Sequence, residues 1–264
     1  DGVITANTSG QDGGGMNCKA DSCPRMTRCA ILGNTADAYG GGVYSLGRSS
    51  LSLSDCRISE NTAPFGGGLH FDHCSPTLTN CVITKNRGGS FEDGYPLPGG
   101  GVFCGDFAHP VFTNCTIAGN SAGVGGGVAC WGGSPTLINC TVSGNFACQN
   151  GGGMYCSRGV PTLTNSIVWG NSGGAISVSP SSMLMPVVTY SCIECDPVWV
   201  GTGNINTDPL FVLASEWGDC PEADPFTCVA YLWNPDTGEP LAWLRWFEGD
   251  CHLQSASPCI DVAT

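Results

Sequence analysis

The chain has 264 residues, including 40 Gly, 17 Pro and 18 Cys, and a formal net charge of −13. This composition disfavours a helical fold, because each Gly inside a helix weakens it by about 1 kcal/mol relative to Ala. The negative charge disfavours nucleic acid and anionic membranes as partners, and no apolar run approaches the roughly 20 residues of a membrane span.

The charge is distributed unevenly along the chain. Residues 1–193 contain 8 basic and 10 acidic residues, whereas residues 194–264 contain 1 basic and 12 acidic residues. We therefore predict a repeat region over 1–193 and an acidic, Trp-rich C-terminal region over 194–264. The acidic region suits a soluble surface and could attract Ca²⁺ or a basic partner, and no other cofactor is expected.

The first residues align with a segment found later in the chain. DGVITAN at the start corresponds to NCVITKN (80–86), which closes a repeat unit. We expect Val3 and Ile4 to continue a stack of strands and Asn7 to begin a stack of Asn side chains. Together with Asp1 they would form an open end onto which a second copy of the chain adds strands.

A repeat organises most of the chain. The triplet GGG recurs with starts 27, 26, 33, 26 and 26 residues apart, and a second block such as SPTLINCTVSGN (134–145) completes each unit. The triplets begin at Gly13, Gly40, Gly66, Gly99, Gly125 and Gly151. An Asn closes every unit, at Asn7, Asn34, Asn61, Asn86, Asn120, Asn145 and Asn171. Five positions earlier each unit has a small residue, namely Gly2, Cys29, Cys56, Cys81, Cys115, Cys140 and Ser166.

The unit from Gly125 to Asn145 illustrates the expected coil. It contains three short segments with period-2 alternation, each bounded by Gly, Pro or Asn, as is typical of short strands. Leu137 is predicted to face inward, and Cys140 and Val142 to share one face of the third strand. Three strands and three bends predict one coil of a parallel β-helix, whose equivalent residues stack about 4.8 Å apart.

The many cysteines favour an oxidising compartment, where thiols pair. Pairing within a coil, as in Cys104–Cys115 or Cys130–Cys140, is compatible with the pattern, and so is pairing between stacked coils. The candidates are Cys18, Cys29, Cys104, Cys115, Cys130, Cys140, Cys192, Cys195, Cys220, Cys228, Cys251 and Cys259. Three glycosylation sequons also occur, at Asn7, Asn114 and Asn139.

Two segments interrupt the repeat. The insertion RGGSFEDGYPLP (87–98) is either a tolerated surface loop or a binding loop, with Phe91, Glu92, Asp93 and Tyr95 as its candidate residues. The segment 215–249 contains a predicted β-hairpin that either caps the β-helix or forms a sticky patch for a glycan or another subunit. Its candidate residues are Tyr231, Trp233, Trp243 and Trp246.

The repeats resemble those of right-handed parallel β-helix proteins of bacterial surfaces, and are similar in style to the GGAI and FxxN repeats of polymorphic outer-membrane proteins. This resemblance covers about residues 1–180. NINTDPLF (204–211) and GDCHLQSASPCIDVA (249–263) resemble the ending of large extracellular β-helix proteins with a variable surface anchor. We therefore expect an all-β protein, secreted or on a cell surface, forming one right-handed parallel β-helix of about seven coils with a C-terminal β-hairpin cap.

The same fold occurs in pectin-degrading enzymes, but their motifs are missing here. Asn206, Thr207 and Asp208 match one triplet of galacturonan hydrolases without the other carboxylates. Asp219, Glu222 and Asp224 could attract Ca²⁺ but lack the spacing of a known loop. We expect no catalysis and predict an extracellular structural subunit that assembles head to tail into a filament or surface layer. The alternatives are an adhesin or glycan-binding rod and, less favoured, a polysaccharide lyase or hydrolase.

Overall fold

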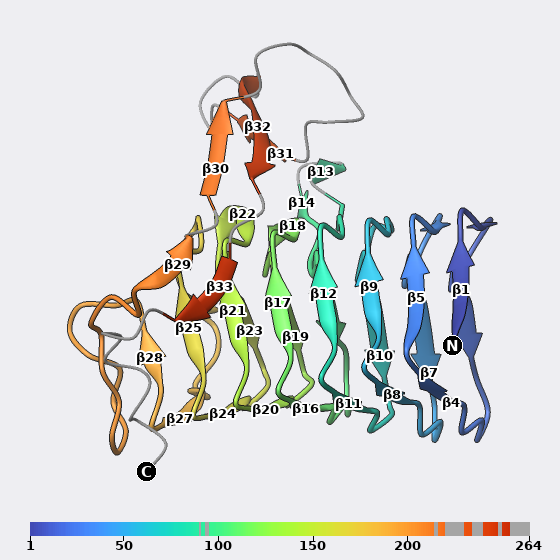
Figure 1. Cartoon of the computed structure of the whole chain (residues 1–264), viewed down its shortest axis with the longest axis horizontal. Coiled ribbons are helices and arrows are strands. Elements are labelled where there is room, and N and C mark those ends of the chain that lie inside the picture. Colours follow the sequence, from blue (N-terminus) through green and yellow to red (C-terminus); the bar gives the residue numbers. More distant parts are fainter. Residues whose placement is uncertain are drawn as a thin grey trace.

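The computed structural model describes residues 1–89, 91–92, 95–213, 216–219, 230–233, 240–247 and 250–253. These residues form strands and turns without an α-helix, and most of them belong to one rod of stacked coils (Figure 1). None of the described segments is a helix long and apolar enough to cross a membrane.

Three parallel sheets run along the rod, and each coil contributes one strand to each sheet. The first sheet contains β1 (Gly2–Thr5), β5 (Cys29–Leu32), β9 (Arg57–Ser59), β12 (Val82–Thr84), β17 (Thr116–Ala118), β21 (Thr141–Ser143), β25 (Ile167–Trp169) and β28 (Cys192–Ile193). The second contains β3 (Met16–Cys18), β7 (Val43–Leu46), β10 (Leu69–Asp72), β15 (Val102–Cys104), β19 (Val128–Trp131), β23 (Met154–Ser157) and β26 (Ile176–Val178). The third contains β4 (Arg25–Thr27), β8 (Ser52–Ser54), β11 (Thr77–Thr79), β16 (Val111–Thr113), β20 (Thr136–Ile138), β24 (Thr162–Thr164) and β27 (Val187–Thr189). The prediction of an all-β parallel solenoid of about seven coils is therefore confirmed.

Short strands pair at the corners and beyond the coils. At the corners lie β2 (Thr8–Ser9) with β6 (Thr35–Ala36), β18 (Ser121–Val124) with β22 (Phe146–Asn150), and β13 (Phe91–Glu92) with β14 (Tyr95–Pro96). Near the C-terminus β29 (Phe211–Leu213) pairs with β33 (Asp250–Leu253). The strands β30 (Glu216–Asp219), β32 (Pro240–Phe247) and β31 (Ala230–Trp233) form an antiparallel sheet.

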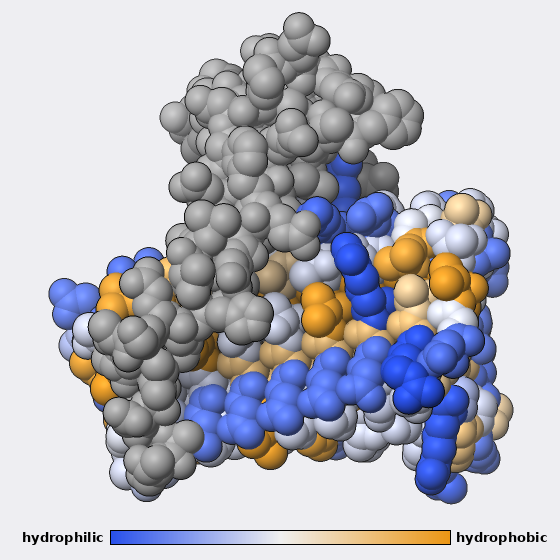
Figure 2. Space-filling view, in the orientation of Figure 1, coloured by the Kyte–Doolittle hydropathy of each residue, from blue (hydrophilic) through white to orange (hydrophobic). Residues whose placement is uncertain are grey.

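The interior of the rod consists of ladders in which like residues stack on like. Leu137 of the third sheet is fully buried and follows Phe112 and precedes Leu163 in register. Cys140 and Val142 are buried as well, which confirms the alternation predicted for this unit. Each fully buried aliphatic side chain contributes about 1.5–3 kcal/mol relative to exposure. Repetition is also visible on the surface, where a row of hydrophilic residues runs along the rod beside a band of hydrophobic ones (Figure 2).

The GGG triplets bring adjacent coils into close backbone contact. Gly125 has a φ of 61°, a left-handed conformation that favours Gly. A Cβ at the next position, Gly126, would collide with the carbonyl group of Phe146 in the following coil. The triplet is therefore a steric requirement of coil stacking.

The closing Asn residues form the predicted ladder inside one corner. Asn61 Nδ2 donates to Asn86 Oδ1 at 2.9 Å and to the carbonyl oxygen of Ile31 at 2.9 Å, and Asn86 Oδ1 also accepts from the Asn61 backbone N–H at 3.0 Å. The same pattern of side-chain bonds links Asn7, Asn34, Asn61, Asn86, Asn120, Asn145 and Asn171. The buried amides are thus satisfied coil by coil.

The cysteines form two further ladders. The sequence left pairing within a coil and pairing between coils open, and the described cysteines form neither kind of disulfide in this structure. Cys104 lies in register with Cys130, and Cys130 with Cys156, whereas Cys115 and Cys140 lie directly before β17 and β21 of the first sheet. Stacking in register therefore places each of these thiols beside its counterpart in the next coil, and Cys104, Cys115, Cys130 and Cys140 are all unpaired in the structure.

The ladder that contains Cys140 acts through hydrogen bonds to the backbone. Cys140 Sγ donates to the carbonyl oxygen of Ile138 at 3.3 Å, and Ser166 Oγ donates to that of Thr164 at 3.0 Å in the next coil. A hydroxyl thus replaces the thiol at the same place. The hydrogen bond with Cys140, together with burial, raises the pKa of Cys115 to about 12, which keeps it protonated.

The predicted C-terminal hairpin exists as a pair of strands, with Tyr231 opposite Trp243 in antiparallel register. In Figure 1 its sheet stands beside the rod near β22, and not across the last coil. Its role as a cap stays a prediction, as does the division of the chain at residue 193. The segment that would connect the two strands, 234–239, lies outside the described residues.

Candidate functional site

Aromatic side chains gather in one groove on the outer face of the second sheet. Its floor is formed by outward-facing residues of consecutive strands, Tyr44 of β7, His70 of β10 and Phe103 of β15, which lie in register. Tyr39 and Phe65, each directly before a GGG triplet, form a second row beside the floor. These side chains line a depression of about 280 Å³.

The rings of the groove contact one another along the rod. His70 lies 4.5 Å from Phe103 and 5.1 Å from Tyr44, measured between ring centroids. Tyr39 contacts both Tyr44, at 5.7 Å, and Phe65, at 5.4 Å. The floor residues are buried at their ring bodies, whereas Tyr39 is 38% exposed and therefore open to a ligand.

Polar side chains form the other wall, where the chain leaves the second sheet. Asp72 accepts from His73 Nδ1 at 2.8 Å, and the imidazole of His73 lies 5.3 Å from the Phe107 ring, measured between centroids, at an interplanar angle of 48°. Further along the rod the wall is continued by Asp106, Trp131 and Arg158. The wall thus combines carboxylates and a guanidinium with an indole ring.

His70 is a polar group held inside the aromatic row. It is 4% exposed, and its Nδ1 lies 3.3 Å from the carbonyl oxygen of Phe65. Burial lowers the pKa of His70 to about 4, so the ring is neutral at pH 7. In a neutral ring, Nδ1–H donates to the carbonyl and Nε2 is left as an acceptor. Burial and the nearby carboxylates of Asp12 and Asp72 raise the pKa of Tyr44 to about 12.

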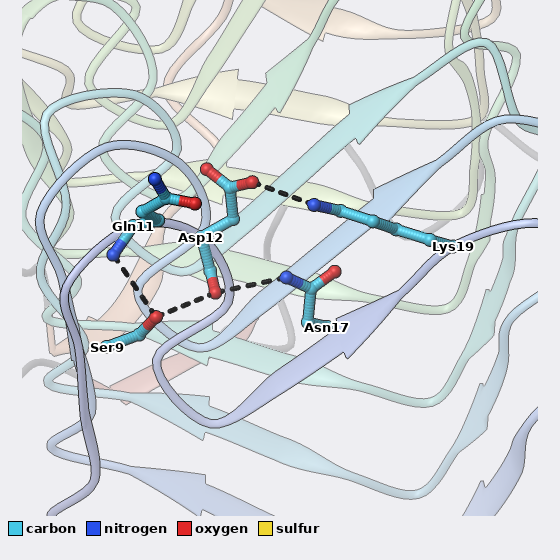
Figure 3. A network of polar contacts seen from close by, with 5 residues as sticks. All are labelled: Ser9, Gln11, Asp12, Asn17 and Lys19. Atoms are coloured by element: carbon cyan, nitrogen blue, oxygen red, sulfur yellow. Dashed lines mark hydrogen bonds and ion pairs between the residues drawn. The ribbon is translucent and has the colours of Figure 1, made fainter.

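An ion pair between Lys19 and Asp12 belongs to a polar network in the first coil (Figure 3). Lys19 Nζ lies 3.0 Å from Asp12 Oδ2 and 5.2 Å from the centroid of the Tyr44 ring. Asn17 Nδ2 donates to the backbone oxygen of Asp12 at 3.2 Å, and Ser9 Oγ donates to the same oxygen at 3.0 Å. Asp12 and Asn17 therefore occupy the positions that Tyr39 and Tyr44 hold one coil later.

The predicted binding loop borders this groove. Phe91 and Glu92 form β13, which pairs with Tyr95 of β14, whereas Asp93 lies outside the described residues. The base of the loop is fixed beside Phe65, because the backbone N–H of Gly89 donates to the carbonyl oxygen of Pro64 at 3.0 Å. The structure thus places the base of the loop next to the aromatic row.

Other predicted residues belong to the C-terminal antiparallel sheet. In its backbone register Tyr231 pairs with Trp243, Trp233 with Pro240, and Trp246 with Trp217. Of the Ca²⁺ candidates, Asp219 ends β30, while Glu222 and Asp224 fall in a segment that the structure does not describe. Elsewhere in the described ranges no group of three His, Cys, Asp or Glu side chains is arranged to hold a metal ion.

The first residues form the outer strand of the first sheet, as predicted. Val3 pairs with Ala30 and Ile4 with Ile31, and Asp1 Oδ1 accepts from Arg28 Nε at 2.7 Å. Val3 is 66% exposed.

The sequon residues Asn114 and Asn139 are exposed and belong to an outer ladder of Asn side chains. Asn139 Nδ2 donates to Asn114 Oδ1 at 3.2 Å, and Asn114 Nδ2 donates to Asn80 Oδ1 at 3.2 Å. Asn7, the third sequon residue, is exposed at the start of the inner ladder. Whether any of the three carries a glycan stays a prediction.

Sequence analysis missed the groove, although the repeat contains a signal for it. Aligning the GGG triplets places Tyr44, His70 and Phe103 at one position, the second residue after each triplet. Tyr39 and Phe65 align at the position before the triplet. His70 belongs to this aromatic row.

The structure is a solenoid with an interior of stacked like residues and an aromatic groove on its outer face. The family described as the right handed beta helix region matches residues 1–147 and again residues 67–204. The chain belongs to this right-handed β-helix family, which confirms the predicted handedness. No curated protein matches the chain.

Proposed function

We propose that this protein binds a glycan in the aromatic groove. The observation that carries the proposal is the continuous row of rings formed by Tyr39, Tyr44, Phe65, His70 and Phe103, with polar side chains along its wall. Members of the family include adhesins and polysaccharide-degrading enzymes. An adhesin or glycan-binding rod was one of the functions that the sequence left open.

The chemistry of a sugar fits this arrangement. A pyranose ring presents C–H groups on its faces, which pack against aromatic rings, and hydroxyl groups around its edge, which need hydrogen-bond partners. In the groove Tyr44, His70 and Phe103 supply the rings, while Asp106 and Arg158 supply an acceptor and a donor. The floor covers three coils, about 10 Å at about 4.8 Å per coil, which suits a short segment of a linear glycan lying along the rod.

Binding and single substitutions test the proposal. A glycan array should identify a ligand, and isothermal titration should then show that Tyr39→Ala and Trp131→Ala each weaken it about tenfold or more, because each removes a ring from the groove. Tyr190→Ala is the matched control, since Tyr190 is exposed outside the groove and should leave affinity unchanged. Equal affinity in all three variants, or no glycan bound by the native protein, would contradict the proposal.

The sequence also left open a lyase or hydrolase, and the same groove would serve as its site. Asp72 and Asp106 are the carboxylates on the wall that could act as acid or base. Incubating the bound glycan with the protein and analysing the products by mass spectrometry distinguishes the two functions. We expect the glycan to stay intact, and a reproducible set of shorter products would replace the binding proposal with a catalytic one.

Head-to-tail assembly is retained as a second proposal. It is supported by the first coil, where β1, β3 and β4 each pair on one side only among the described strands. Such an edge can accept a further coil, either from a second copy or from preceding residues of a longer chain. Sedimentation velocity over a range of concentrations should show oligomers, and a monomer at every concentration would contradict this proposal. An extracellular or cell-surface location, implied by the resemblance to bacterial surface proteins, is proposed for either function.

A further inference from the structure

One ammonium group of the protein itself lies beside a ring of the groove floor. The Nζ of Lys19, which follows β3, lies 5.2 Å from the Tyr44 ring centroid and 3.0 Å from Asp12 Oδ2. A cation over an aromatic face, with a carboxylate beside it, is a favourable arrangement for an amine. The first coil thus shows what kind of group the rings and carboxylates of this groove can hold.

The same combination recurs further along the groove without a lysine. Phe103 supplies a ring on the floor and Trp131 of the next coil a ring on the wall, and Asp106 lies in the turn after β15, in the same coil as Phe103. A Cβ on Gly132 would collide with Asp106 Oδ1, so the carboxylate lies against the residue that follows Trp131. Within the described parts of the chain, no side chain donates a hydrogen bond to the Asp106 carboxylate or forms an ion pair with it.

A buried histidine lines the same space. His70 is 4% exposed, its Nδ1 is engaged with the Phe65 carbonyl, and its Nε2 has no partner among the described residues. The Nε2 atom keeps access to solvent in the groove, where a ligand can donate a hydrogen bond to it. A protonated amine carries three donors and no acceptor, so it matches both Nε2 and the Asp106 carboxylate.

The charge of the groove favours a cation over an anion. The lining contains Asp72 and Asp106 against one guanidinium, that of Arg158, and the whole chain has a net charge of −13. A glycan rich in carboxylate or sulfate groups would be repelled at long range, whereas an amino glycan would be attracted.

We infer that the groove selects glycans with free amino groups, such as oligomers of glucosamine, and that Asp106 with the rings of Phe103 and Trp131 holds the ammonium group. This inference rests on the proposed glycan-binding function and adds the class of sugar. Arg158 then lies at the edge of the site, where it contacts sugar hydroxyl groups.

The test compares two ligands that differ only in the charge of the amine. Isothermal titration of the full chain is carried out with a glucosamine oligomer and with the N-acetylglucosamine oligomer of the same length. We expect the free amine to bind about tenfold more tightly, because acetylation removes the cation–π and charge-assisted contacts. In Asp106→Asn the preference should fall to about twofold or less, with little change in affinity for the acetylated oligomer.

Asp55→Asn is the matched control, because Asp55 is exposed on a different face and Asn occupies the equivalent place in later coils. It should keep the preference for the free amine. Equal binding of both oligomers to the native protein would overturn the inference while leaving glycan binding intact. An equal loss in Asp106→Asn and Asp55→Asn would also overturn it, because only overall charge would then matter. Failure to bind either oligomer or any other glycan would contradict the proposed function itself.

Discussion

The inner Asn ladder and the groove floor are built by the same stacking of coils, yet they differ in composition. Every coil from Asn34 to Asn171 places the same amide at the same corner, and each amide bonds to its neighbour. On the floor the equivalent positions change from Asn17 to Tyr44, His70, Phe103 and Ala129. At the ladder position, where the side chain bonds to the next coil, the residue type is constant. At the floor position, where the side chain faces solvent or a ligand, the residue type varies from coil to coil. The difference separates residues that hold the rod together from residues available for binding.

The largest loss of stability is expected where the backbones of adjacent coils are in close contact. Gly126→Ala should lower the free energy of unfolding by about 3 kcal/mol or more, because the added Cβ collides with the Phe146 carbonyl group of the next coil. Gly10→Ala is the control, since its nearest neighbour would be Asp37 Oδ2 at 3.9 Å. Urea denaturation measures both variants. A Gly126→Ala protein as stable as the control would show that the coils can separate at this point without loss.

The second prediction compares the inner and the outer Asn ladders. Asn86→Ala removes the acceptor of the Asn61 side chain and the donor to the Ile58 carbonyl oxygen, so we expect a loss of about 3 kcal/mol from unsatisfied buried groups. Asn114→Ala, in the exposed outer ladder, should cost about 0.5 kcal/mol, because water replaces the lost partner. Urea midpoints provide the test, and similar losses in both variants would remove the distinction between the ladders.

The third prediction concerns acid and the groove floor. The pKa of His70 is about 4 in the folded protein and about 6.5 when unfolded, so the unfolded state gains a proton first as the pH falls. Above pH 6.5 the shifted pKa of His70 does not change the free energy of unfolding. As the pH falls to 4, it lowers that free energy by up to about 3 kcal/mol. His70→Phe should remove that part of the acid sensitivity, as measured by urea midpoints at pH 7 and pH 4.5. His109→Phe, an exposed control, should not, and equal acid sensitivity in all three proteins would contradict the burial of a neutral His70.

The fourth prediction, with the smallest expected change in stability, compares the ladder that contains Cys140 with the ladder that contains Cys104. Cys140→Ser should be tolerated, because the hydroxyl can donate to the Ile138 carbonyl oxygen as Ser166 does to Thr164. Cys104→Ser should cost about 2 kcal/mol more, because its neighbours in the ladder are sulfur atoms and the buried hydroxyl finds no carbonyl acceptor. Thermal denaturation under reducing conditions checks the pair. Equal losses of stability in the two variants would mean that the backbone hydrogen bonds of the ladder that contains Cys140 contribute nothing to stability.

Most of the solenoid could be predicted because one unit determines the next. The positions of Asn61, Leu137 and Val142 follow from the spacing of GGG and Asn alone, since a fixed unit length brings equivalent residues into register. Which cysteines lie next to one another could not be predicted in this way. Whether Cys104 meets Cys115 or Cys130 depends on which sheet each strand joins, and alternation within one coil does not determine this.

The groove was only partly accessible to prediction, for a physical reason. The floor residues Tyr44, His70 and Phe103 keep a constant distance from the triplet, so an alignment finds them once the outward position is considered. Asp106 and Arg158 lie in turns whose length varies between coils, and only the folded backbone brings them to one wall. The loop 87–98 and the strands after residue 211 leave the repeat, so no neighbouring unit predicts their position.

The Asn ladder gives the rod a direction. From Asn7 to Asn145 each side-chain amide donates one hydrogen bond to the Oδ1 of the Asn in the following coil, so the bonds between side chains all run in one direction along the axis. At the first coil Asn7 Oδ1 accepts no hydrogen bond from the described residues. A coil that continues the ladder there, from this chain or another, supplies an amide donor at that corner. The ladder is therefore directional, and copies that join through it extend the rod only when their coils all run in the same direction along the axis.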